Sequence, residues 1–272
     1  MEPQKYPYPF REIELKIIES LDSLVARVRH RARNSVYCIN RAWEIKDIDP
    51  NMSIFRAITA EEEAATALIC ALQLRKYPSS ELLDLYNHRH KSGIYPFVSA
   101  ILQSCGPIAE ITPQIKLSHQ RKRPEFSLMM AGCAEVPDPL NIMVFDGSGD
   151  GEDLAPVDFS PAMKMLAAER GASSVAQFVK EEANLRNRLL YALDNGVWRV
   201  DKPEQMIRER AKHVMVLLGI VLAVWQVRTP QMLAIHALES YLKALGLKID
   251  KPHDFSDVIA KQRELLRNAK KS

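Results

Sequence analysis

Residues 53–72 read SIFRAITAEEEAATALICAL, and they contain the clearest helical pattern of this chain. Apolar side chains recur in them at three- and four-residue steps, with helix-favouring alanines between. Asp49-Pro50-Asn51 interrupts the pattern on the N-terminal side, and Ser53 can cap the first turn. We predict a helix that begins at Ser53, ends near Tyr77-Pro78 and packs one side into a core.

The same periodicity extends over most of the chain. From Phe10 to about Lys46 it predicts one long helix or two helices joined end to end. Caps and breakers predict the further helices, which we list by their expected limits: Ser79 or Ser80 to Gly93, Ile94 to Cys105 before a Gly106-Pro107 stop, a helix from Ser160-Pro161, Ser173 or Ser174 to Leu193, Pro203 to Arg228, Pro230 to Leu245, and Asp254 to Lys270.

Residues 107–160 have a different texture, rich in proline and glycine with short apolar runs at 126–130 and 142–145. Such a texture favours short strands and loops. The predicted fold is mainly α, an antiparallel helical bundle with an inserted strand-containing segment. Its parts are an N-terminal helical part, 1–106, the insertion, 107–160, and a C-terminal helical part, 161–272, which packs with the first as one bundle.

Bulk composition indicates a globular protein without an export signal. The chain has 272 residues, 47% of them hydrophobic, and a formal charge of +3, which permits nucleic-acid binding without demanding it. The N-terminal residues are acidic and proline-rich, and the apolar run 214–225 is too short to span a bilayer, so we expect a cytoplasmic protein with no membrane association. Four widely spaced cysteines, without a CxxC pair, are expected to be free thiols: Cys38, Cys70, Cys105 and Cys133.

Glu61, Glu62 and Glu63 form an acidic triplet on the first helix described above. Consecutive helical residues point about 100° apart, so three neighbours cannot converge on one metal ion. We expect all three to be solvated at the surface. The alternative is that Glu62 or Glu63 holds a basic residue of a neighbouring helix.

The segment Asn87-His88-Arg89-His90-Lys91 is the first candidate site. His88 and Lys91 are three residues apart and share a helical face, whereas Arg89 and His90 point elsewhere. A histidine that exchanges protons near neutral pH, beside a cation that stabilises a phosphate, is the minimum for metal-free RNA cleavage. The simpler interpretation is a polar helix end whose cations favour the C-terminal dipole.

A second candidate pairs Arg208 with His213, five residues apart, which could face one groove. About one such Arg–His spacing is expected by chance in this chain, so the spacing alone decides nothing. Basic residues around the two candidates could contact an RNA backbone, although a mixed salt-bridged surface is equally consistent with the nearby glutamates. The predicted RNA-contacting residues are Arg89, Arg186, Arg188, Arg210 and Lys212.

No phosphate-binding loop, dinucleotide fingerprint or nucleophile elbow occurs in the sequence, and we predict no cofactor and no metal. A weaker alternative is a metal-dependent hydrolase that uses His88, His90 and nearby carboxylates. It requires a ligand geometry that two helical residues two positions apart supply poorly.

Three stretches together resemble the HEPN superfamily, and within it the AbiV-like abortive-infection proteins: residues 56–68, the 87–91 cluster, and 186–196 followed by Asp201-Lys202-Pro203-Glu204. The resemblance implies an antiparallel helical bundle that dimerises, and metal-independent endoribonuclease activity in a defence or toxin system. The family's catalytic motif is an arginine, usually a polar residue, and a histidine four to six positions on. Arg208 and His213 keep that spacing with Glu209 after the arginine.

Two functional hypotheses follow. In the first, the chain is an HEPN-like homodimer that binds or cleaves RNA, with His213 or His88 transferring a proton and Arg208 or Lys91 stabilising the phosphate. In the second, it is a non-enzymatic helical module that binds a protein partner. A large exposed apolar patch near Ile142 to Phe145 would distinguish the second hypothesis.

Overall fold

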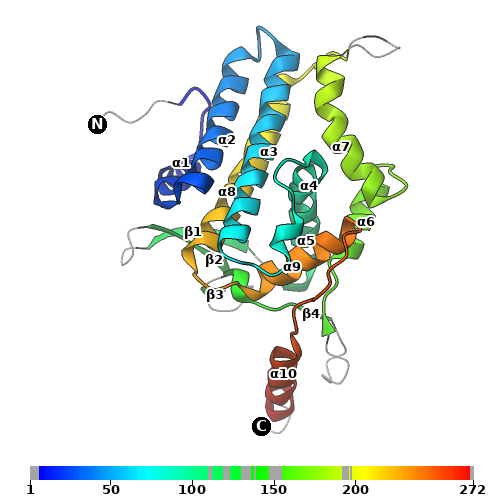
Figure 1. The fold of residues 1–272 in the computed structure, drawn as a ribbon. Coiled ribbons are helices and arrows are strands. Elements are labelled where there is room, and N and C mark those ends of the chain that lie inside the picture. Colours follow the sequence, from blue (N-terminus) through cyan, green and yellow to red (C-terminus); the bar gives the residue numbers. More distant parts are fainter. Residues whose placement is uncertain are drawn as a thin grey trace.

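The computed structural model describes residues 6–109, 112–118, 123–129, 136–137, 139–146, 155–191, 196 and 198–269. The described chain is mainly helical and forms a helical bundle, which confirms the predicted fold class at that level (Figure 1). Its α-helices are α1 (Glu12–Ser20), α2 (Ala26–Ile45), α3 (Pro50–Leu74), α4 (His88–Ser92), α5 (Ile94–Ala109), α6 (Ser160–Glu169), α7 (Val175–Leu190), α8 (Pro203–Gln226), α9 (Met232–Ala244) and α10 (Ser256–Ala269).

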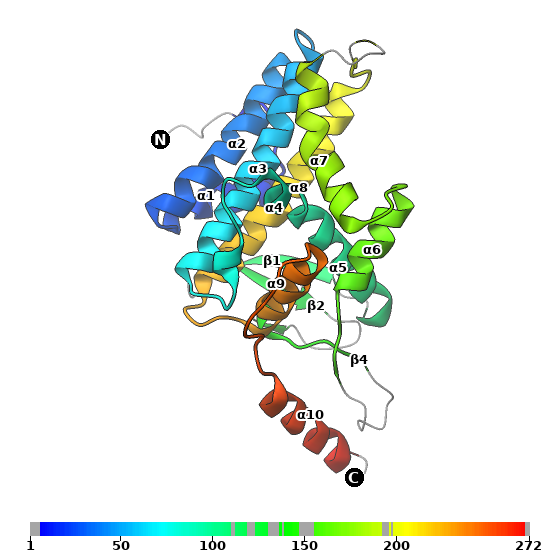
Figure 2. The ribbon, with the colours of Figure 1, turned by 45° about the vertical axis from the view of Figure 1, so that its right-hand side comes forward.

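Helix α3 is the central element of the bundle. It packs mainly against α2 and α8 and also contacts α7 and α4 (Figure 2). Most of its residues are buried, including Ile54, Ala57, Ala64 and Ile69. The alanines leave little side-chain bulk between α3 and its neighbours, so the surrounding helices can approach it closely. The apolar run 214–225 lies in α8 and is largely buried, as expected of a core helix.

Several predicted helix limits were wrong. Helix α3 begins at Pro50, because the Asp49 carboxylate accepts a hydrogen bond from the Met52 N–H at 3.0 Å and caps the first turn. The helix predicted from Ser79 or Ser80 divides into a 3₁₀ turn, η2 (Ser80–Leu82), and α4, which Asn87 caps. Helix α5 continues through Pro107 to Ala109, so the predicted stop at Gly106-Pro107 was wrong.

The strands lie in the segment where the sequence favoured them. β1 (Thr112–Ser118) pairs antiparallel with β2 (Arg123–Met129), which also pairs with β3 (Val136–Pro137). β4 (Phe145–Asp146) and β5 (Ala155–Pro156) form a second, two-stranded sheet. The short turn η3 (Pro139–Asn141) contacts α8 and α9, so this segment folds back onto the helices.

The apolar residues at 142–145 do not form the large exposed patch that a partner-binding insertion would present. All four are partly buried, and Met143 and Val144 pack against the core. Among the described helices, none is both long enough and apolar enough to cross a membrane. Cys38 and Cys70 are buried free thiols, as predicted, whereas the side chains of Cys105 and Cys133 lie outside the described part of the chain.

Gly93 allows α4 and α5 to approach α9 closely. The Tyr241 hydroxyl donates a hydrogen bond to the His90 carbonyl at 3.0 Å, and a Cβ placed on Gly93 would lie 2.5 Å from that hydroxyl. The Gly93→Ala variant should therefore be less stable by about 1–3 kcal/mol, as measured by urea unfolding. Adding Tyr241→Phe, which removes the clashing oxygen, should recover part of the loss; no recovery would contradict this packing account.

His236 supplies a pH-dependent term to stability. It is buried between Phe159 and Phe255, its Nδ1 has no hydrogen-bond partner among the described residues, and burial lowers its pKa although Asp158 opposes the shift. The folded protein thus binds fewer protons here than the unfolded chain, whose histidine pKa is about 6.5. The contribution of neutral His236 to the free energy of unfolding is fully present above about pH 6.5 and is lost as the pH falls below that value.

The His236→Gln variant cannot titrate and should lose less free energy of unfolding than the wild type between about pH 7.5 and pH 5.5. Part of the pH dependence should remain, because burial also lowers the pKa of His90. Urea unfolding at both pH values measures the difference. Equal pH dependence in the two proteins would rule out His236 as a contributor.

Candidate functional site

Glu61 and Glu62 are buried in the bundle, which corrects the prediction that the acidic triplet is solvated. Their exposed fractions are 4% and 6%, while Glu63 is partly exposed. Charged groups are rarely buried unless they are paired. The alternative prediction, that Glu62 or Glu63 holds a basic residue of a neighbouring helix, is correct for Glu62, and Glu61 does the same.

Glu61 binds two basic side chains of α8. One carboxylate oxygen, Oε2, lies 2.8 Å from Arg210 Nη1 and 2.9 Å from His213 Nδ1. Arg210 and His213 are three residues apart on α8, so they share the face that meets α3. The Tyr95 ring of α5 stacks on the imidazole with 3.5 Å between centroids and 17° between planes, which fixes the orientation of His213.

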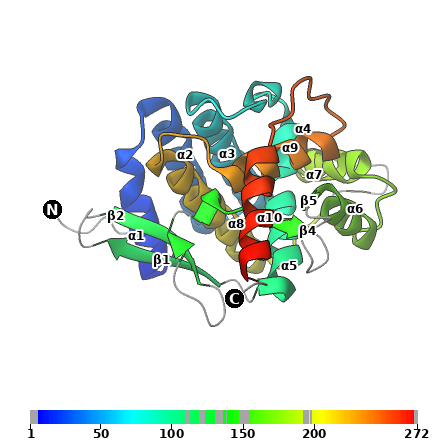
Figure 3. The same ribbon diagram turned by 90° about the horizontal axis from the view of Figure 1, so that it is seen from below.

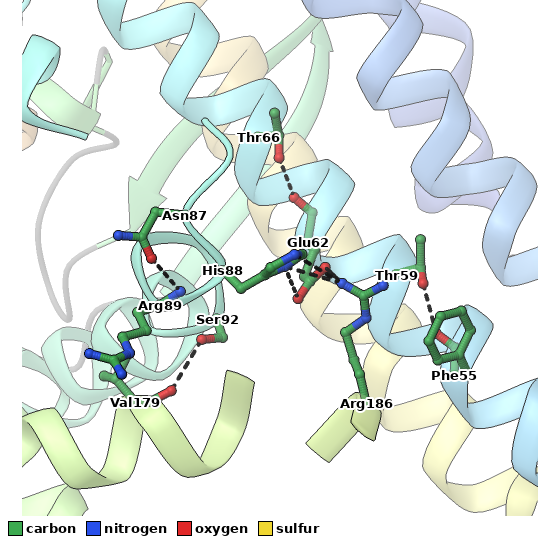
Figure 4. Close-up of polar contacts among 10 residues, drawn as sticks. All are labelled: Phe55, Thr59, Glu62, Thr66, Asn87, His88, Arg89, Ser92, Val179 and Arg186. Atoms are coloured by element: carbon green, nitrogen blue, oxygen red, sulfur yellow. Dashed lines mark hydrogen bonds and ion pairs between the residues drawn. The ribbon is translucent and has the colours of Figure 1, made fainter. Parts of the chain in front are cut away.

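Glu62 binds one side chain from α4 and one from α7 (Figure 4). Its Oε1 lies 3.1 Å from His88 Nδ1, and its Oε2 accepts a hydrogen bond from Arg186 Nη1 at 2.9 Å. Arg186 Nη1 also lies 3.1 Å from His88 Nδ1. Nδ1 cannot donate to the carboxylate and accept from the guanidinium at once; the charge-assisted donation to Glu62 is the stronger of the two.

In both pairs the histidine presents its second ring nitrogen as an acceptor. A carboxylate only accepts hydrogen bonds, so Nδ1 must carry the proton and Nε2 is left unprotonated in the neutral ring. The side chain of His88 is 50% exposed and that of His213 is 23% exposed. Each imidazole therefore has a buried carboxylate at Nδ1 and is partly exposed as a side chain, and Arg186 Nη1 lies 3.4 Å from Nε2 of His88.

Helix α7 joins the two pairs into one network. Glu182 on α7 lies 3.6 Å from Arg210 Nη2, and Arg186 follows one turn later on the same helix. Ser174 begins α7 by accepting a hydrogen bond from the Gln177 N–H, which confirms a predicted cap. The Arg186 guanidinium also lies over the Phe55 ring at 4.9 Å, so α7 is held to α3 by both charge and stacking.

The electrostatic balance keeps Glu61 ionised. Burial alone would raise the pKa of this carboxyl, but Arg210 and His213 outweigh burial and lower it. Burial disfavours the charged form of Arg210, yet Glu61 and Glu182 raise its pKa. Burial and Glu61 together raise the pKa of the Tyr95 phenol, so Tyr95 serves here as a neutral stacking partner.

The structure brings together only some of the predicted site residues. His88, His213, Arg186 and Arg210 belong to the network. Arg208 does not: it pairs with Glu204 at 2.9 Å and lies over the Trp43 ring of α2. Among the described residues, no carboxylate contact joins Lys91 to the network. The remaining predicted RNA-contacting residues are exposed outside the network: Arg89, Arg188 and Lys212.

A metal-binding geometry does not occur among the described residues, because no three His, Cys, Asp or Glu side chains converge. The His90 ring of the weaker alternative accepts a hydrogen bond from the Asp84 N–H at 3.0 Å instead of facing His88. Sequence reasoning missed Glu61, Glu182 and Tyr95. The helical phase of Glu61 relative to the buried Ala57 and Ala64 is the signal that could have identified it.

Replacing Glu61 with Gln should destabilise the protein by about 3–5 kcal/mol, because Arg210 would remain buried without its main counter-charge. The Glu204→Gln variant is a matched control, since it also breaks a glutamate–arginine pair, but one at the surface that is worth about 0–1 kcal/mol. Urea unfolding measures both. Similar losses in the two variants would contradict the role assigned to burial.

Comparison of the chain with family models, curated proteins and solved structures finds no match. Both histidines of the network are partly exposed: 50% of the side chain for His88 and 23% for His213.

Proposed function

We propose that this chain binds RNA and cleaves it without a metal ion, with His88 and His213 as the proton-transfer groups. One observation carries the proposal: two partly exposed histidines are each oriented by a buried carboxylate, and the carboxylates belong to adjacent residues of α3. Each histidine also has a guanidinium beside it, Arg186 or Arg210. Oriented imidazoles with neighbouring cations are the groups that phosphodiester cleavage requires.

The reaction is a transesterification within the RNA. A neutral imidazole removes the proton of a 2′-hydroxyl, whose oxygen attacks the adjacent phosphorus and forms a new P–O bond. The P–O5′ bond breaks, and a protonated imidazole gives its proton to the leaving 5′-oxygen. The products are a 2′,3′-cyclic phosphate and a 5′-hydroxyl. Glu61 and Glu62 orient the imidazoles, and the guanidiniums stabilise charge on the phosphoryl oxygens.

The proposal includes an HEPN-like identity. The resemblance to the AbiV-like group supports it at three stretches, and two of these, 56–68 and 87–91, contain Glu61, Glu62 and His88. The third stretch, 186–196, begins with Arg186. We infer on this basis a cytoplasmic homodimer that acts in abortive infection. The Arg208–His213 motif of the resemblance receives no such support, since Arg210 is the arginine beside His213.

A second candidate function is a non-enzymatic helical module that binds a protein partner. The pairing of both guanidiniums favours it: Arg186 and Arg210 are already bound to buried carboxylates, which reduces the positive charge available to a phosphate. In that case the network only fixes the relative positions of α3, α4, α7 and α8. This candidate predicts that RNA stays intact during prolonged incubation with the protein.

The test is incubation of the purified wild type with end-labelled RNA in EDTA. We expect fragments that end in 2′,3′-cyclic phosphate. His88→Ala and His213→Ala should each lower the cleavage rate by about 10²–10⁴-fold, the usual value of a general acid or base. The cleavage rate of the double variant should be only a little lower than that of the slower single variant, because the two groups act in one step.

The exposed His253 provides the matched control, since His253→Ala makes the same change outside the network. Its cleavage rate should equal that of the wild type. If the double variant cleaves RNA as fast as the wild type, the assignment of the site is wrong. If the wild type leaves RNA intact, the interaction module becomes the better account.

A further inference from the structure

The N-terminal half of α2 is strongly basic. Residues 27–33 read RVRHRAR, and no acidic residue occurs between Asp22 and Glu44. Arg27 and His30 are exposed, and Arg31 is partly exposed. Arg33 forms an ion pair with Asp22 at 2.8 Å. The other arginines have neutral partners: Arg31 donates to the Arg27 carbonyl, and the Arg27 side chain hydrogen-bonds the Cys70 thiol.

This placement of charge is unfavourable for the helix itself. The first turns of a helix favour negative charge, because the dipole is positive there. Arginines four residues apart, as at 27 and 31 or 29 and 33, repel each other. Within the described part of the chain, Asp22 is the one carboxylate that pairs with this half of α2. A polyanion bound here would remove both the repulsion and the conflict with the dipole.

A small cavity adjoins this basic segment. It has a volume of about 200 Å³ and lies between the end of α1, the 3₁₀ turn η1 (Leu21–Ser23) and the ends of α3 and α8. Its polar lining comes from Ser20, Ser23, Arg75, Gln226 and Arg228, and its described lining includes no carboxylate. Because η1 also carries Asp22, the partner of Arg33, the cavity and the basic half of α2 are neighbours.

Arg75 is held rigidly at this cavity. Its guanidinium lies 3.9 Å from the centroid of the Trp225 ring, and its Nη2 donates to the Trp225 carbonyl, which caps the last turn of α8. Its Nε is buried and has no hydrogen-bond partner among the described residues. Capping uses only one of the five guanidinium N–H groups, and the exposed Arg228 adds a second cation that no described carboxylate neutralises.

We propose that the N-terminal half of α2, together with the Arg75–Arg228 cavity, is a docking surface for the phosphodiester backbone of RNA. The cavity receives one phosphate, and the α2 arginines contact the phosphates that follow. Figure 3 views the bundle along its length, with α1, α2, α3 and α8 beside one another. This inference rests on the proposed function in taking RNA as the partner.

The docking surface is separate from the histidine network. Arg75 follows Glu61 by fourteen residues at the end of α3, which corresponds to about 21 Å along the helix. The acidic triplet points in different directions: Glu61 contacts α8, and Glu62 contacts α4 and α7. Glu63 instead raises the pKa of the thiols of Cys38 in α2 and Cys70 in α3. Binding and cleavage can therefore be removed independently.

The experiment measures the Kd of an RNA oligonucleotide that is 2′-O-methylated throughout, and so cannot be cleaved, by fluorescence anisotropy over a range of KCl concentrations. The Arg27→Gln/Arg31→Gln variant should weaken binding at least tenfold. The slope of log Kd against log salt should fall by about 1.4 in this variant and by about 0.7 in Arg228→Gln, because each phosphate contact of a single strand contributes about 0.7.

The matched control is Arg170→Gln/Lys248→Gln, which removes the same charge from exposed positions elsewhere. It should keep the wild-type slope; an equal loss in the control would show that net charge alone matters and would overturn the proposal. Unchanged binding in both α2 and Arg228 variants would also overturn it, as would binding of phosphatidylserine vesicles in place of RNA.

The His88→Ala/His213→Ala variant separates this inference from the proposed ribonuclease. It should keep the wild-type slope of log Kd against log salt, because the docking surface sets that slope. Binding that depends on α2, with no RNA cleavage by the wild type, would refute the ribonuclease and support the docking surface. Normal cleavage and binding in the α2 variants would refute the docking surface and leave the ribonuclease in place.

Discussion

The buried negative charges of Glu61 and Glu62 are the constraint on which the arrangement of this bundle depends. A buried carboxylate is costly unless cations and hydrogen bonds surround it. Because the two side chains point about 100° apart on α3, different neighbouring helices must supply their counter-charges. Glu61 is matched from α8 by Arg210 and His213, and Glu62 from α4 and α7 by His88 and Arg186. The apolar contacts of α3 hold the helices together, and these four ionic contacts fix how the helices are rotated and how far each slides.

The same pairing gives the histidines a defined chemical form. Each donates Nδ1–H to its carboxylate, which leaves Nε2 as the acceptor of the neutral ring. The paired guanidiniums make the cluster more rigid but less available to a substrate phosphate. We propose that the two tasks are divided: arginines at the end of the bundle attract a polyanion, and the oriented imidazoles transfer protons. A purely structural network would need no histidine at the solvent edge, since a lysine or arginine can neutralise a carboxylate at every pH of interest.

Much of the helical framework could be predicted from periodicity and caps, because both depend on neighbouring residues alone; the Ser174 cap is an example. The burial and pairing of Glu61 and Glu62 could not be predicted in this way, because their partners lie 26 to 152 positions away in sequence. The choice between Arg208 and Arg210 shows the same limit. They are two positions apart on α8 and point about 200° apart, so one meets Trp43 on α2 and the other meets Glu61 on α3. Only the packing of α8 against both helices decides which arginine accompanies His213.

We propose that His88 and His213 exchange protons in one reaction, and the measurement that tests this is the pH dependence of kcat/KM for RNA cleavage. Two groups that must be in opposite protonation states give a bell-shaped profile. The account predicts such a profile for the wild type, and the loss of one limb in His88→Ala and of the other in His213→Ala. A profile that keeps both limbs in these variants, or a wild type without RNA cleavage at any pH, would contradict it.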